Sequence, residues 1–253
     1  MASEISDRKK QILEAIVSDY IDTAEPVGSF TITHHYVRQY SPATIRAEMA
    51  ELEQVGYITH PHTSAGRIPT DLGYRYFVDH IMETKKVAGK EIALIKSGIR
   101  KIGHGFEEIL HGTVKMISSL MDYVAVFASF GKGKKQVFSS GYSNILKQPE
   151  FQDVSHAQKV MSALEQEDFL ARILEEYSSK RELDIKIGHE IRFRDMQDLS
   201  IAVVKHNVLG INPGAIGIIG PTRMDYIRVK SILDCVSKEL ESMERETINV
   251  RGN

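Results

Sequence analysis

The sequence has little of what marks secreted or membrane-spanning chains. It contains one cysteine in 253 residues, which excludes a disulfide framework and suits a reducing compartment. No apolar run approaches the about 20 residues that a membrane-spanning helix needs. The first residues, MASEISDRKK, contain no apolar signal core. We therefore expect a soluble, cytoplasmic protein with no membrane partner.

The sequence also lacks an excess of positive charge. The formal net charge is −2 at pH 7, and residues 1–86 contain more Asp and Glu than Lys and Arg. Non-specific attraction to DNA phosphates should therefore be modest. Any DNA binding must rely on a few well-placed cations, or on a dimer that doubles the contacts.

What is present is most informative in residues 41–73, SPATIRAEMAELEQVGYITHPHTSAGRIPTDLG. Ser41 suits the N-cap of a helix and Pro42 suits its first position. The pattern predicts a helix that runs to about Val55 and stops at Gly56.

The two faces of this predicted helix differ in the size of their side chains. At 100° per residue, the core face consists of Ile45, Met49 and Leu52. The opposite face is built on Ala43 and Ala47, flanked by Thr44 and Arg46. Small side chains allow a close approach to base edges, and the two polar ones can bind phosphate or bases. An ordinary amphipathic surface helix would show the same pattern. The segment that follows is therefore needed to distinguish a DNA-binding helix from a plain surface helix.

That segment predicts a hairpin wing. Residues 57–60 have strand character, 61–66 form a turn-rich tip, and 67–69 can return before Thr70 caps another helix. Arg67 would lie where a wing meets the DNA backbone or the minor groove. His60 and His62 have no second cluster of metal-ligating residues at a spacing typical of a metal site, so we expect no metal.

The residues before this helix complete a helix-turn-helix pattern. Residues 6–22 predict a first helix, 29–36 a short positioning helix, and 37–40 the turn into the next helix. Ser29 can contact phosphate or cap its own helix. The residues that we expect to contact DNA are Ser29, Arg38, Ser41, Ala43, Thr44, Arg46, Ala47, His62 and Arg67.

Residues 92–120 have apolar side chains at alternating three- and four-residue steps, which predicts one long helix with a heptad seam. The candidate dimerisation residues are Ile92, Ile95, Ile99, Ile102, Phe106 and Ile109. Gly98, Gly105 and Gly112 share a flanking heptad position, so two backbones can come close along that side. The seam's partner is either the same stretch of a second subunit or the chain's own C-terminal part.

After residue 122 the pattern alternates between strands and helices, which predicts a sheet with helical cover. The expected strands are 123–130, 136–140, 184–187, 199–206 and 215–220. The expected helices are 155–164, 168–179 and 224–246.

Five segments together carry a family resemblance. They read YIDTAEPVGS (20–29), SPATIRAEMAELE (41–53), GYITHPHTSAGRIPTDLGYRYFVDHIM (56–82), SNILKQPEF (143–151) and GIIGPTRMDYIRV (217–229). With them the chain resembles the HrcA family of heat-inducible transcription repressors. The resemblance implies a homodimer on an inverted-repeat operator of chaperone genes, released on heat stress, with the chaperonin as co-regulator. It also implies a GAF-like fold for the C-terminal part.

The chain departs from the family pattern at two places. Family members commonly have asparagine where this chain has Ala47, so an amide able to contact adenine is absent. The chain also resembles a short form, because only residues 130–141 stand where typical members carry an inserted domain. That insert is implicated in dimerisation in the family, which makes the 92–120 seam the candidate replacement.

These patterns predict an α+β protein of three parts: a winged-helix DNA-binding domain at 1–84, a linker and dimerisation helix at 85–121, and a GAF-like domain at 122–253. We expect no enzyme and no cofactor, because Cys235 lies on an apolar helix face and the polar residues near His189 lack triad or metal spacing. The alternative is a winged-helix regulator controlled by a small molecule bound in the GAF-like domain.

Overall fold

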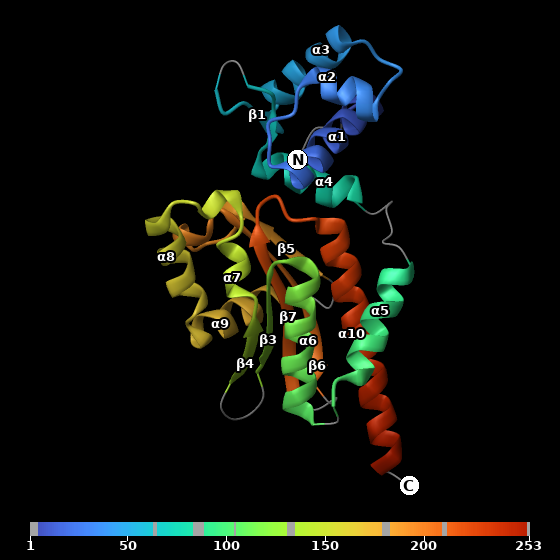
Figure 1. Ribbon diagram of the computed structural model, residues 1–253, viewed down its shortest axis with the longest axis vertical. Coiled ribbons are helices and arrows are strands. Elements are labelled where there is room, and N and C mark those ends of the chain that lie inside the picture. The colour runs from blue at the N-terminus through green and yellow to red at the C-terminus, as the bar shows by residue number, and fades with distance from the viewer. Residues whose placement is uncertain are drawn as a thin grey trace. The chain divides into compact units, whose positions relative to one another are not determined.

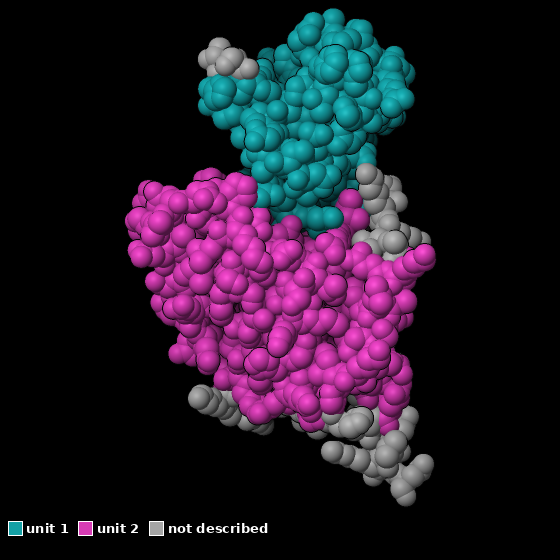
Figure 2. Space-filling model, in the orientation of Figure 1, with its two compact units in different colours: residues 1–85, 222–226 teal, residues 86–221, 227–253 magenta. Residues whose placement is uncertain are grey.

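The computed structural model describes residues 5–62, 65–82, 89–103, 105–130, 135–178, 183–208 and 212–251. The chain divides into two compact units, coloured separately in Figure 2. The first unit comprises residues 1–85 and 222–226, and the second comprises 86–221 and 227–253. Helices and antiparallel strands occur together, which confirms the predicted α+β class (Figure 1).

The first unit contains the helices and the short ribbon expected of a winged helix, in the expected order. They are α1 (Asp7–Thr23), α2 (Ser29–Thr31), the π-helical turn η1 (Ile32–Tyr36), α3 (Pro42–Gln54), β1 (Ile58–Thr59), β2 (Ile68–Pro69) and α4 (Asp71–His80). The predicted caps at Ser41 and Thr70 are confirmed, since their hydroxyls accept bonds from main-chain N–H groups at the starts of α3 and α4. Ser6 caps α1 in the same way. Each cap satisfies a donor that the helix itself leaves unpaired.

The wing is joined to the segment that precedes α2. Its strands pair antiparallel, with Ile58 opposite Pro69. Beyond that pair, Arg67 and Val27 exchange two main-chain hydrogen bonds of 2.8 and 2.9 Å. A β-carbon on Gly66 would lie 2.6 Å from the carbonyl oxygens of Pro26 and Val27. A glycine is therefore needed where the wing passes this segment.

The second unit is built on a five-stranded antiparallel sheet in the order β4-β3-β7-β6-β5. Its strands are β3 (Val124–Ser129), β4 (Gln136–Ser140), β5 (Asp184–Ile187), β6 (Leu199–Val208) and β7 (Asn212–Pro221). Its helices are α5 (Gly89–Lys101), α6 (Phe106–Met121), α7 (Tyr142–Ile145), α8 (Val154–Leu164), α9 (Glu167–Tyr177) and α10 (Tyr226–Arg251), with short 3-10 turns at Pro149–Phe151, Gly188–Glu190 and Arg194–Met196.

Helices cover both faces of this sheet (Figure 1). One face of β3, with Val124 and Val126, packs into a core with Leu170 and Leu174 of α9. The opposite face is covered by α6, which contacts β3 and β4, and Ser237 of α10 lies 3.5 Å from His206 of β6. Every residue of β3 is buried, as expected for a central strand with apolar cover on both sides.

The predicted single helix across residues 85–121 is wrong. The structure has two helices in this range, since α5 ends at Lys101 and α6 begins at Phe106. A β-carbon on Gly98 would lie 2.7 Å from Met116 Sδ, and one on Gly112 would lie 2.5 Å from Ile102. The glycines do allow two helices to come close, but the helices are neighbours in one chain. The heptad spacing arose because each helix buries one apolar stripe.

The candidate dimerisation residues do not form one exposed stripe. Ile95 and Ile99 are buried, with 1% and 0% of their surface exposed, while Ile92, Ile102 and Ile109 are half-buried. The helix α5 is held to α10 by ion pairs, among them Arg228 to Glu91 at 2.8 Å. The sequence left two possible partners for this seam, a second subunit or the chain itself. Ile95 and Ile99 are buried within the chain's own second unit. The side chain of Phe106 lies outside the described residues.

Candidate nucleic-acid interface

The outward face of α3 is a stripe of small side chains with one cation. The inward face is the predicted one, since Ile45, Met49 and Leu52 are buried. The exposed stripe consists of Ala43, Arg46, Ala47, Ala50 and Gln54. We call these five residues the α3 stripe. With three alanines, the stripe can approach base edges closely, and the exposed carboxylate beside it, Glu51, is paired with Lys9.

Two arginines next to the stripe have no carboxylate partner among the described residues. Arg46 is exposed, and its side chain makes no ion pair or hydrogen bond with any of the described residues. Arg38, in the turn before α3, donates from Nε only to the main-chain oxygen of His34, at 3.0 Å. Both guanidinium groups therefore keep their charge available for an anion.

The acidic residues of α3 are all paired with cations from neighbouring elements. Glu48 forms an ion pair of 3.0 Å with Arg8, and Glu51 forms one of 2.8 Å with Lys9. Glu53 pairs with Arg67 at 2.8 Å. Such pairs contribute little to stability at a surface. They do neutralise the negative charge of the helix locally. The net negative charge of residues 1–86 therefore does not repel DNA phosphate at α3.

Arg67 lies on the second limb of the wing, as its sequence context predicts. Its Nε and Nη2 both donate to Glu53 Oε2, at 3.0 and 2.8 Å, so a contact of Arg67 with DNA would have to displace this carboxylate. Only 24% of its side chain is exposed. Sequence reasoning missed Glu53 altogether. The available signal was a carboxylate in the last turn of α3, shortly before a predicted wing with histidine and arginine on its two limbs.

His60, on the first limb of the wing, bonds through Nδ1 to the other oxygen of the same carboxylate. Burial raises the pKa of Glu53, but the bonds from His60 and Arg67 outweigh it and bring that pKa below its ordinary value of 4.5. A carboxylate that gains partners on folding binds fewer protons in the folded state than in the unfolded state.

This shift predicts a pH dependence of stability. Because the folded pKa of Glu53 is the lower one, its contribution is fully present above 4.5 and is lost as the pH falls through the folded pKa. Urea unfolding of the parent and of Glu53→Gln, at neutral pH and below pH 4.5, measures this. The difference in unfolding free energy between the two should shrink in acid. If the difference in unfolding free energy were the same at both pH values, the ionised Glu53 would not be what stabilises the fold.

The remaining candidates are spread around α3. Ser41 caps the helix, and its Oγ lies 3.0 Å from the hydroxyl of the half-buried Thr44. Ser29 is the first residue of α2, but the N-cap is Gly28 and no side-chain cap is made there. His62 is exposed at the end of the described first limb of the wing.

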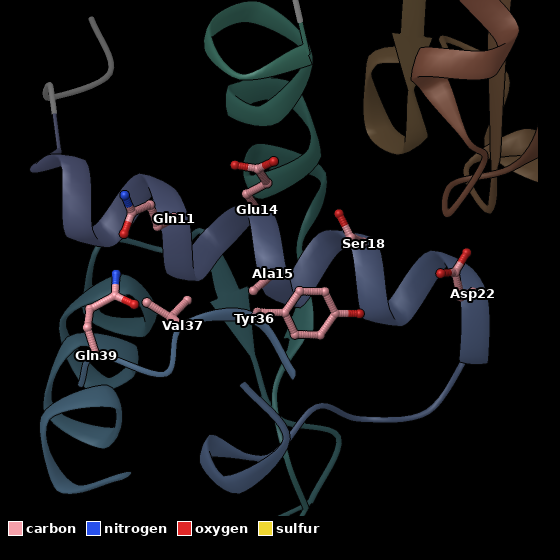
Figure 3. Close-up of a pocket in the computed structure, with 8 residues that line it drawn as sticks. All are labelled: Gln11, Glu14, Ala15, Ser18, Asp22, Tyr36, Val37 and Gln39. Atoms are coloured by element: carbon pink, nitrogen blue, oxygen red, sulfur yellow. The ribbon is translucent and has the colours of Figure 1, made fainter. Parts of the chain in front are cut away.

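A hollow of about 370 Å³ lies between α1 and the end of η1 (Figure 3). It is lined by Gln11, Glu14, Ala15, Ser18, Asp22, Tyr36, Val37 and Gln39. The Tyr36 hydroxyl donates to Asp19 at 3.0 Å, and burial together with this bond raises the pKa of Tyr36 to about 12. Because its lining includes two carboxylates, the hollow disfavours phosphate and does not extend the α3 stripe.

Comparison with known proteins decides the family. The family model described as "HrcA protein C terminal domain" matches residues 84–229. The heat-inducible transcription repressor HrcA of Desulforamulus reducens is 32% identical, over 94% of this chain and 96% of the relative. The chain belongs to the HrcA family.

Other comparisons agree with this assignment. The heat-inducible transcription repressor HrcA of Desulforudis audaxviator is 31% identical, over 93% of this chain and 97% of the relative. A crystal structure described as that of a hypothetical protein superposes with a TM-score of 0.74 at 18% identity, over 94% of this chain and 99% of that one. The second likeness shows the fold alone.

The chain is a short member of the HrcA family. The match to the Desulforamulus reducens relative extends over 338 positions, more than the 253 residues of this chain. That relative therefore contains residues without a counterpart here. In this chain β3 and β4 pair as an antiparallel hairpin, with Ser129 opposite Gln136.

HrcA relatives are named as repressors, in keeping with the expectation that this chain is not an enzyme. Cys235 is 6% exposed, and burial raises the pKa of its thiol, which makes it a poor nucleophile. Within the described part of the chain, no three His, Cys, Asp or Glu side chains gather as a metal site would require. No described helix is both long and apolar enough to cross a bilayer.

Proposed function

We propose that this HrcA family member is a sequence-specific DNA-binding repressor of chaperone genes. The observation that supports it best is the α3 stripe, a surface of small side chains whose arginine pairs with no carboxylate of the described residues, on a helix whose acidic side chains are all paired. In the proposed complex α3 enters the major groove, and the N-terminus of α3 with Ser41 faces a phosphate. Ala43 and Ala47 contact thymine methyl groups or leave room for water.

A homodimer on an inverted-repeat operator is part of this proposal, because a two-fold operator is matched by a two-fold protein. The dimer contact does not use Ile95 and Ile99, which the second unit already buries. We further propose that the repressor acts in the cytoplasm, is released on heat stress, and depends on the chaperonin as co-regulator. These last points come from the family resemblance.

The first test is a fluorescence titration of the full chain at stated salt. One duplex carries the inverted-repeat operator of the family, and a second of equal length carries the same bases in scrambled order. We expect much tighter binding to the operator. Equal weak binding to both would contradict sequence-specific recognition, or point to an operator altered by Ala47. Sedimentation of the protein alone separates a changed operator from a failure to dimerise.

Arg46→Ala should weaken operator binding by about 1 to 3 kcal/mol, because it removes the exposed cation from the α3 stripe. The matched control is Arg75→Ala on α4, which removes the same charge from an arginine that pairs with Asp79 at 3.1 Å. The control should bind the operator almost as the parent does. Equal losses in both variants would mean that net charge, and not the docking of α3, controls affinity.

The alternative of a regulator controlled by a small molecule makes a different prediction about release. In that case a metabolite, and not the state of the chaperonin, would lower the affinity for the operator. The hollow of Figure 3 lies in the first unit, so it lends no support to a ligand site in the GAF-like part. Adding purified chaperonin to the titration distinguishes the two mechanisms.

A further inference from the structure

One carboxylate holds both limbs of the wing. Glu53 lies in the last turn of α3, where Oε1 bonds to His60 and Oε2 accepts from two nitrogens of Arg67. The third nitrogen of that guanidinium, Nη1, donates to the main-chain oxygen of Ala65 at 3.4 Å. Every nitrogen of the Arg67 guanidinium thus has an acceptor within the first unit.

The main chain of the wing is fixed at the same place. Arg67 exchanges hydrogen bonds with Val27 through both its N–H and its C=O. The side chain of Arg67 is 24% exposed and that of Glu53 is also 24% exposed. A phosphate that approaches the wing therefore meets a guanidinium already neutralised by a charge-assisted pair, which it must displace.

Arg67 differs in this respect from the arginines beside the α3 stripe. Arg38 and Arg46 are exposed, and no carboxylate of the described chain pairs with either. The same surface thus presents two kinds of cation. One kind is available to any anion, and the other is withheld by Glu53.

We propose that Glu53 is a specificity-determining residue that keeps Arg67 from binding DNA phosphate. Phosphate contacts raise affinity for every sequence equally, whereas base contacts discriminate between sequences. Withholding one cation therefore lowers the affinity for random DNA without altering the α3 stripe. The inference rests on the proposed DNA-binding function and adds a residue that limits its non-specific part.

The test measures binding of the full chain to a random-sequence duplex as a function of salt, over roughly 50 to 200 mM. Glu53→Gln keeps the size of the side chain and removes its charge, which frees Arg67. We expect Glu53→Gln to bind the random duplex several-fold more tightly at the low-salt end. The slope of log affinity against log salt should become steeper by about 0.9 for each bound subunit, the value for one added phosphate contact.

Two controls isolate the released arginine. Asp79→Asn also removes one negative charge and breaks an ion pair of an arginine, that of Arg75 on α4, and it should leave the slope unchanged. The double variant Glu53→Gln with Arg67→Gln should return the slope to the parent value. A steeper slope in Asp79→Asn, or in the double variant, would overturn the assignment to Arg67.

The proposal is also overturned if folded Glu53→Gln has the slope of the parent. Circular dichroism checks folding. If Glu53→Gln does not fold, Glu53→Asp keeps the charge but shortens the side chain by one methylene group, and it should steepen the slope as well. An unchanged slope in Glu53→Asp then overturns the proposal.

Failure here is distinct from failure of the proposed function. Discrimination between operator and scrambled DNA by the parent tests the function, and the slope difference on random DNA tests Glu53. A parent that discriminates while Glu53→Gln shows no change in slope would sustain the first and overturn the second.

Discussion

We expect Gly73→Ala to lower the free energy of unfolding of the first unit by about 3 kcal/mol or more. A β-carbon at this position, in the first turn of α4, would lie 2.0 Å from the carbonyl oxygen of Tyr57. That oxygen cannot move freely, because it accepts the main-chain N–H of Thr70 at 3.1 Å. Overpacking against a fixed backbone destabilises a core by about 1 to 3 kcal/mol, and sometimes by more.

Urea unfolding followed by circular dichroism measures this effect. Gly28→Ala is the control within the same unit, because a β-carbon on Gly28 would meet no atom within 4 Å. It should change stability by less than about 1 kcal/mol, the usual size of an N-cap effect. Similar losses in the two variants would show that the close approach of α4 to Tyr57 is not what requires glycine.

Asn144→Leu should destabilise the second unit by about 3 kcal/mol, because it removes the donor from two main-chain carbonyls. Asn144 is 7% exposed, and its Nδ2 donates to the oxygens of Ser118 and Tyr123 at 3.1 and 3.2 Å. One side chain thus ties the end of α6 and the start of β3 to α7. This contact explains the asparagine of the SNILKQPEF segment.

Thermal and urea unfolding check the Asn144 prediction, with the exposed neighbour Ser143→Ala as the control. The control should be nearly neutral. An Asn144→Leu chain as stable as the parent would mean that water replaces the lost donor at both carbonyls.

The sequence predicted most elements of the fold, since their signals are local. Helix caps at Ser6, Ser41 and Thr70 lie next to the donors that they satisfy. The strands 136–140 and 184–187 were predicted with the observed bounds. What the pattern did not give was the pairing, because an antiparallel order of β4-β3-β7-β6-β5 depends on contacts between distant segments.

The break between α5 and α6 shows the limit of a periodic pattern. A heptad repeat predicts which side chains share a face, but two helices that fold back on one domain have the same periodicity as one helix in a coiled coil. The local signal was present, since Gly103 and Gly105 stand within one turn and disfavour a continuous helix. The shared heptad position of Gly98, Gly105 and Gly112 favoured close packing of one continuous helix instead.

For the candidate interface too, the sequence predicted the local features but not the contacts between distant residues. The faces of α3 followed from spacing alone, and the inward residues are the buried ones. The pairing of Arg67 with Glu53 could not be predicted, because Glu53 is 14 residues away and the turn of the wing brings the two together. Tertiary contacts of charged side chains leave no periodic trace in a sequence.

The order of strands in the second unit has a consequence for how the chain folds during synthesis. The first unit is made almost entirely of residues 1–85, so its contacts close soon after those residues are made. The strand β3, in contrast, pairs over Val124–Ser129 with Gly214–Ile219 of β7. Contacts between such distant segments form slowly. One edge of the apolar strand β3 must therefore stay unpaired until β7 is made, and this interval is when an assisting protein would have most exposed surface to bind.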